Sequence, residues 1–193
     1  MVGEDVTSIV LNVPYDAAKY PKDIDYDSAV CLAIRKSFLK AFLSDFRQYF
    51  EGKSVGDLGC GEALPREILK EIGIKCEYTG IDHSTRSGCG SGNYTNRPDI
   101  IWDYEMYAPA DETMVFDTVL WLCPTHLDRI DCLVPYVRPG GNLIVQRAGD
   151  DLDALLKDPF ALIGKKAYHV SVQGEGPMKD FYVDNVFLIG MKN

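Results

Sequence analysis

The chain has 193 residues, of which 46% are hydrophobic, and its 20 Lys and Arg against 29 Asp and Glu give a formal net charge of −9. This size predicts one domain with a proper core, because two ordinary domains need a longer chain. The acidic balance disfavours nucleic acid as a partner. No signal peptide is recognisable, and no apolar run approaches the roughly 20 residues that cross a bilayer. We expect a cytoplasmic or nuclear protein that does not enter a membrane.

The cysteines predict neither a metal site nor a disulfide framework. There are six, and no pair has the C-x-x-C spacing of a zinc site. Most lie inside apolar patterns, so reduced intracellular thiols are the simplest interpretation.

The N-terminal third predicts a solvated segment followed by a helix. Residues 1–27 carry six acidic residues against two lysines, which is typical of a solvated surface segment. From Ser28 to Phe50, apolar residues recur with a period of 3.6 and predict an amphipathic helix. We therefore expect residues 1–50 to form a helical N-terminal extension.

The remainder alternates between strand and helix patterns. We expect helices at Leu64–Ile72, Thr125–Val137 and Asp151–Ile163, and strands at Ser54–Leu58, Lys75–Asp82, Asp99–Trp102, Val115–Leu122, Asn142–Gln146, Ala167–Val172 and Phe181–Met191. Residues 83–98 contain three glycines and no apolar period, and predict a loop. This alternation of apolar strands with helices predicts an α/β fold with a mostly parallel sheet in three layers. The last two strands follow one another through a turn, which suggests one antiparallel strand near the C-terminus.

The stretch SVGDLGCGEALPREIL, residues 54–69, has the strand, glycine turn and helix that hold nucleotide-like cofactors. A Walker A loop is excluded, because Gly52-Lys53-Ser54 precedes the strand and the first required glycine falls at Arg47. A dinucleotide fingerprint, G-x-G-x-x-G, is weakened by Leu64 at the third glycine position.

The acid in D-L-G-C-G-E-A fits a ligand with a zwitterionic amino-acid tail better than a diphosphate. Glycines at 59 and 61 let the backbone approach a ligand closely, and Asp57 can meet an ammonium group. In this motif the chain resembles the class I S-adenosylmethionine (SAM)-dependent methyltransferases, whose first motif has the form [DE]-x-G-x-G-x. Ala63 stands at the third motif glycine, a substitution that the family tolerates.

The resemblance continues through residues 54–146, which we interpret as the cofactor-binding core of a single domain spanning residues 1–193. It implies a Rossmann-like three-layer sandwich with a mostly parallel seven-stranded sheet and one antiparallel strand. It also implies that Asp82 accepts hydrogen bonds from the ribose hydroxyls and that Asp103 and Tyr104 lie at the adenine. The loop at 83–98 departs from the family, which commonly has a helix there. The implied cofactor-binding set is Asp57, Gly59, Cys60, Gly61, Asp82, His83, Asp103, Tyr104 and Leu122.

Several of these residues also have purely structural interpretations. Tyr104 can serve packing as well as adenine binding, and the assignment of Asp103 depends on where the preceding strand ends. Cys60 is also interpretable as a small core residue. His126 follows the fourth core strand and is the candidate general base, with a structural role as the alternative.

The expected activity is methyl transfer from SAM to an unidentified acceptor, with a small molecule favoured. The sequence LCPTH follows the fourth strand, where amino-methylating nucleic-acid enzymes of the family carry [DNS]-P-P-[YFW]. Methyl transfer to protein or nucleic acid remains an alternative, as does a non-catalytic SAM-binding protein or partner subunit.

Overall fold

The computed structural model describes residues 6–15, 23–83, 98–122, 127–148, 156, 158–173, 178 and 180–193. Within these ranges the chain forms one eight-stranded sheet in the order β1-β7-β8-β6-β5-β2-β3-β4. The strands are β1 Val6–Asn12, β2 Ser54–Leu58, β3 Glu77–Asp82, β4 Ile100–Ile101, β5 Phe116–Leu122, β6 Val137–Ala148, β7 Phe160–Gln173 and β8 Tyr182–Lys192. β8 runs antiparallel to both of its neighbours, and every other pairing is parallel.

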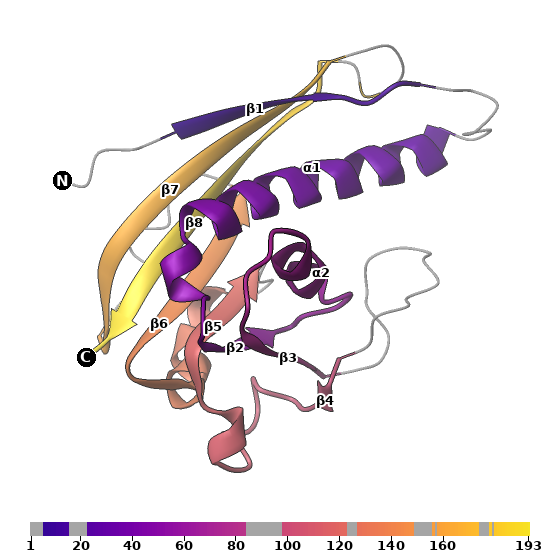
Figure 1. Cartoon of the computed structure of the whole chain (residues 1–193). Coiled ribbons are helices and arrows are strands. Elements are labelled where there is room, and N and C mark those ends of the chain that lie inside the picture. Colours follow the sequence, from indigo (N-terminus) through magenta and orange to yellow (C-terminus); the bar gives the residue numbers. More distant parts are fainter. Residues whose placement is uncertain are drawn as a thin grey trace.

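Helices of two kinds accompany the sheet. The α-helices are α1 Asp23–Asp45 and α2 Leu64–Glu71, and the 3-10 helices are η1 Arg47–Tyr49, η2 Glu112–Met114 and η3 Leu127–Tyr136. Figure 1 shows α1 lying along the sheet, with α2 beside it above the carboxyl ends of the central strands. The mixed α/β sheet and its single antiparallel strand agree with the expectation from the sequence.

The number of strands is a correction, because the sheet has eight strands and not seven. Val6–Asn12 lies in the segment that was expected to be only solvated, and it pairs in parallel with β7. Its side chains alternate, with Ile9 and Leu11 packed against the core and Val6 and Val10 exposed. This period of two indicates a strand. The acidic residues that flank this strand made residues 1–27 look like a solvated segment, and the short alternation of apolar residues was overlooked.

Two further elements differ from their predictions. Residues 160–163 begin β7 and do not end a helix, while residues 151–155 of that predicted helix lie outside the described residues. Pro159 would stand inside such a helix, where it removes a backbone donor. The helix expected at Thr125–Val137 is a 3-10 helix over Leu127–Tyr136, and Pro135 lies within it.

The core has two main parts, one on each face of the sheet. On one face α1 packs against β8, where the rings of Phe42 and Phe187 stack with centroids 3.9 Å apart. On the other face, Trp121 and Leu143 pack with Leu133 of η3. Complete burial of such side chains supplies most of the driving force that fixes α1 over the strands.

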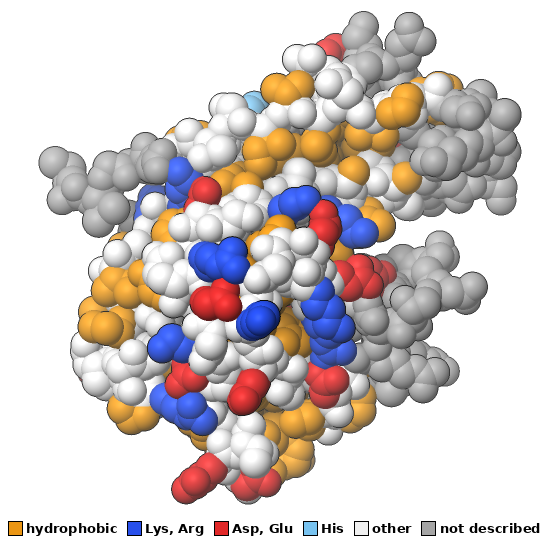
Figure 2. Space-filling view, viewed as in Figure 1, with side chains coloured by type: hydrophobic (Ala, Val, Ile, Leu, Met, Phe, Trp, Pro, Cys, Tyr) orange, Lys and Arg blue, Asp and Glu red, His pale blue; other side chains and the backbone are white. Residues whose placement is uncertain are grey.

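The surface in the view of Figure 2 carries mixed charges. Lys and Arg side chains alternate with Asp and Glu over the body of the molecule, without a large area of one sign. Among the described residues, no helix is long and apolar enough to cross a membrane.

Candidate functional site

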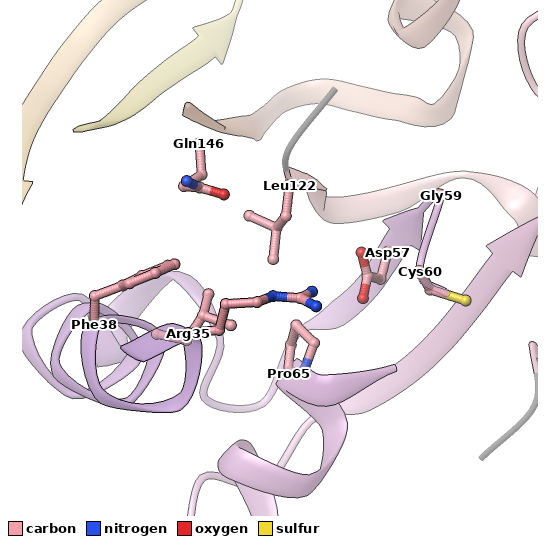
Figure 3. A pocket seen from close by; sticks show the side chains of 9 residues that line it. Arg35, Phe38, Asp57, Gly59, Cys60, Pro65, Leu122 and Gln146 are labelled. Carbon is pink, nitrogen blue, oxygen red and sulfur yellow. The ribbon is translucent and has the colours of Figure 1, made fainter. Parts of the chain in front are cut away.

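A pocket opens where the carboxyl ends of β2, β5 and β6 meet α1 (Figure 3). In open α/β sheets, ligands bind at the carboxyl ends of the parallel strands. The pocket is lined by Arg35, Phe38, Leu39, Asp57, Gly59, Cys60, Pro65, Leu122 and Gln146. Its lining therefore combines apolar side chains with a cation, an anion and an amide.

The glycine turn after β2 takes a conformation that favours glycine. Gly59 and Gly61 have φ angles of +73° and +51°. A Cβ added at Gly59 would lie 2.7 Å from the hydroxyl oxygen of Tyr104, which is too close for any side chain. The backbone N–H groups of Gly59 and Cys60 donate to the carbonyl of Ile81, at 2.8 and 3.2 Å. The turn is thereby held against the end of β3.

Asp57 is buried at the floor of the pocket. It is 2% exposed, and the hydroxyl of Tyr78 donates a hydrogen bond to its Oδ2. Burial raises the pKa of the Asp57 carboxyl from 3.8 to about 7, while the Tyr78 hydrogen bond and the charge of Arg35 act in the opposite direction. A buried carboxyl with this pKa gains its charge most readily when a cation binds beside it.

Asp82, the last residue of β3, is joined directly to the glycine turn. The backbone N–H of Gly61 donates to its Oδ2 at 2.9 Å, and Nδ1 of His83 lies 3.0 Å from its Oδ1. Asp82 is 6% exposed, whereas the His83 side chain is mostly in solvent. The carboxylate thus lies beside the backbone that lines the pocket.

Asp103 and Tyr104 have visible structural roles. Oδ1 of Asp103 accepts hydrogen bonds from the backbone N–H groups of Glu105 and Met106, both at 3.2 Å. Tyr104 is 8% exposed and belongs to the core cluster under the glycine turn. Neither residue lines the pocket, so an adenine contact for either remains a prediction.

Of the sequence-predicted residues, the structure brings Asp57, Gly59, Cys60 and Leu122 together as pocket walls. Burial raises the pKa of the Cys60 thiol, so this group is held in its neutral form. His126, the candidate base, lies outside the described residues.

Sequence reasoning missed the contribution of α1 to this pocket. Arg35 is an exposed residue of α1 that follows the buried Ile34 and precedes the buried Phe38 by three residues. It belongs to the polar face of an amphipathic helix, so no sequence signal separates it from the other exposed cations of α1. Gln146 was also missed, although a polar residue at the end of an apolar strand is a signal.

Arg35 supplies the positive charge of the pocket. In Figure 3 its guanidinium extends across the pocket toward Asp57. Within the described part of the chain, it has no ion-pair partner and no hydrogen bond. Its five N–H donors are therefore available to an anionic ligand group.

No protein-family model matches the sequence, and no curated protein matches it with significant similarity. Solved structures do match. A Thermoplasma acidophilum protein designated 1320 aligns with a TM-score of 0.55 at 14% identity, over 82% of this chain and 85% of its own. Two named enzymes also align. The Burkholderia thailandensis 1,6-didemethyltoxoflavin-N1-methyltransferase does so with a TM-score of 0.52 at 14% identity, over 82% and 76% of the two chains. Coclaurine N-methyltransferase does so with a TM-score of 0.52 at 11% identity, over 81% and 72%.

Both enzymes were crystallised with S-adenosylhomocysteine (SAH) and a small molecule. This chain therefore has the fold of the SAM-dependent methyltransferases, and the resemblance seen in the sequence is confirmed at the level of the fold.

Proposed function

We propose that this chain is a SAM-dependent methyltransferase that acts on a small molecule. The observation that carries the proposal is the pairing of Asp57 and Arg35 across one pocket beside the glycine turn. An anion and a cation on facing walls complement a zwitterionic amino-acid group, such as the methionine tail of SAM. A diphosphate would instead place its charges against the buried carboxyl of Asp57.

The residues present fit the cofactor. Asp57 would hold the ammonium group, and Arg35 would hold the carboxylate through paired N–H donors. Asp82 accepts a hydrogen bond from the backbone N–H of Gly61 in the glycine turn, and it is the proposed partner of the ribose hydroxyls. SAM, when bound, supplies an activated methyl group.

The chain itself needs to do little beyond binding and alignment. Phe38 and Leu122 form apolar walls that exclude water from the pocket. Holding two reactants in line can supply most of the acceleration of such a transfer. His126 remains the proposed base that receives a proton from the acceptor.

A small-molecule acceptor is favoured by a pocket that combines apolar side chains with a few polar groups, and by the mixed surface charge in Figure 2. The two named structural neighbours are N-methyltransferases of small molecules, which is consistent with this proposal. Protein and nucleic-acid acceptors can be tested in the same turnover assay.

The first test is binding, measured by calorimetry with SAH and with NADH. The proposal predicts that SAH binds and NADH does not. An Arg35→Met variant keeps the length of the side chain and should weaken SAH binding at least tenfold, because it loses a charged hydrogen bond of about 1.5–3 kcal/mol. Lys36→Met, on the neighbouring exposed position of α1, is the matched control. Binding of NADH alone, or equal effects of the two substitutions, would contradict the proposal.

A further inference from the structure

The two edges of the sheet differ in how they are protected against pairing with another chain. An edge strand presents unpaired backbone N–H and C=O groups, and folded proteins protect such a strand by keeping it short or by placing charges or proline on it. At one edge, β4 has only two residues. At the other edge, β1 has seven residues with the sequence VTSIVLN, which contains no charge and no proline. β1 therefore has none of these protections.

The outer side of β1 has no partner strand in the described part of the chain. β1 pairs with β7 along one side, and it is the last strand of the sheet in that direction. Figure 1 shows β1 along this margin of the sheet. Successive residues of a strand direct their backbone groups to opposite sides, so about half of these groups point away from β7. They form a template on which a further strand can pair.

Apolar side chains of β1 also stay exposed on both faces of the sheet. Val6 and Val10 are 53% and 51% exposed on the face away from α1. On the other face, Ile9 and Leu11 pack against the core cluster that includes α1, but they are only partly buried. A strand added beyond β1 would cover both rows, because residues that lie opposite one another share a face.

We propose that β1 pairs in antiparallel with β1 of a second copy, so that the chain forms a two-fold dimer with one continuous sheet. A two-fold axis sets the strand against itself, and a strand without charge then brings no like charges together. This matters for a chain of net charge −9, whose copies otherwise repel one another. The dimer is closed, because β4 is too short to accept β1 and extend the sheet into a fibre.

The exposed valines select the register of the pairing. If the axis lies between the two copies of Ser8, Val6 lies opposite Val10 of the partner subunit. On the face that α1 covers, Thr7 lies opposite Ile9 of the partner subunit. Each exposed valine thus gains an apolar, β-branched neighbour, which is a favourable cross-strand pair.

This dimer leaves the cofactor pocket of each copy open. The pocket lies at β2, β5 and β6, and β7 and β8 separate these strands from β1. An axis perpendicular to the sheet also keeps both α1 helices on the same face. The inference is therefore independent of the proposed function.

The first test is analytical ultracentrifugation of the full chain over a series of concentrations. The contact between two strand edges is smaller than a standard interface, so we expect a reversible dimer with a dissociation constant on the order of 10 μM. A protein that stays monomeric up to about twenty times that concentration, or one that assembles beyond the dimer, would overturn the proposal.

Residue 8 provides the specific test because it faces its own copy. Ser8→Lys sets two like charges opposite each other and should weaken the dimer at least about tenfold, and Ser8→Glu should do the same. Mixing the two variants should restore a dimer that contains one chain of each, because unlike charges then meet across the axis. Ala110→Lys, at an exposed position before η2, is the matched control and should leave the dimer unchanged.

The outcomes of the variants decide between surfaces. Ser8 is exposed, so its variants should fold, which an unchanged thermal unfolding of the dilute protein verifies. A dimer that Ser8→Lys does not weaken would lie on another surface, and a mixture of the two variants that stays monomeric would exclude the two-fold pairing. Either result overturns the inference. Failure of the unaltered protein to bind SAH would refute the proposed function and leave this inference in place.

Discussion

The pKa of Asp57 makes a quantitative prediction about cofactor binding. The free protein holds this carboxyl at a pKa of about 7, chiefly because it is buried. The ammonium group of SAH requires the charged form. Raising the pH through 7 should therefore strengthen binding, because above this pH the carboxyl is already ionised and does not have to release a proton when the ligand binds. Ionisation rises from about one tenth at about pH 6 to about nine tenths at about pH 8, so the affinity should rise about tenfold.

Calorimetric titration of SAH at a series of pH values is the assay. Asp57→Asn should weaken binding at high pH and remove most of the pH dependence. His83 lies against Asp82, so His83→Gln serves as a control that should leave the dependence in place. An affinity that changes less than about twofold over this range, or a dependence that persists in Asp57→Asn, would refute the reasoning.

The same carboxyl predicts the pH dependence of stability in the free protein. A raised pKa means that the folded state keeps a proton that the unfolded state has released, so stability falls as the pH rises from 3.8 to about 7. A shift of this size corresponds to about 4 kcal/mol as an upper bound. Asp57→Asn should therefore raise the free energy of unfolding in urea at about pH 8 and have little effect at about pH 4. Destabilisation by this substitution at high pH would contradict the assigned burial cost.

Three further substitutions test the surroundings of the pocket. Tyr78→Phe removes a hydrogen bond that lowers the pKa of Asp57, so the pH midpoint of SAH binding should move upward; an unchanged midpoint contradicts this role. Gly59→Ala should abolish SAH binding and destabilise the fold, because its Cβ would lie 2.7 Å from the Tyr104 hydroxyl at a φ of +73°. Adding Tyr104→Phe to this variant should restore part of the stability but not remove the backbone strain. A Gly59→Ala variant of unchanged stability would contradict the assigned clash. Phe42→Ala should cost about 3–5 kcal/mol in urea unfolding, because this buried ring stacks on the sheet; a loss below about 1 kcal/mol would show that α1 is not fixed there.

The sequence predicts the central part of the fold well because its signals there are local. The strand at Ser54–Leu58 was predicted with the observed bounds, since apolar residues, a glycine turn and a proline-started helix coincide. The edge strand at Val6–Asn12 was missed because its pairing partner, β7, lies about 160 residues further along the chain. A short alternating pattern can be assigned to a strand of this sheet only when its distant pairing partner is known.

The same distinction applies to the site. Asp57, Gly59 and Cys60 belong to one continuous motif and could be predicted together. Arg35 and Gln146 reach the pocket from α1 and β6, and their proximity depends on how the helix lies across the sheet. No spacing in the sequence expresses that arrangement, although Gln146 is a polar exception in an apolar strand.

A crystal structure of the protein with SAH tests the central claim most directly. The account predicts that the ammonium group of the ligand lies within hydrogen-bond distance of Asp57, its carboxylate at Arg35 and its ribose hydroxyls at Asp82. A ligand bound elsewhere, or one whose amino-acid tail lies away from Asp57 and Arg35, would contradict it.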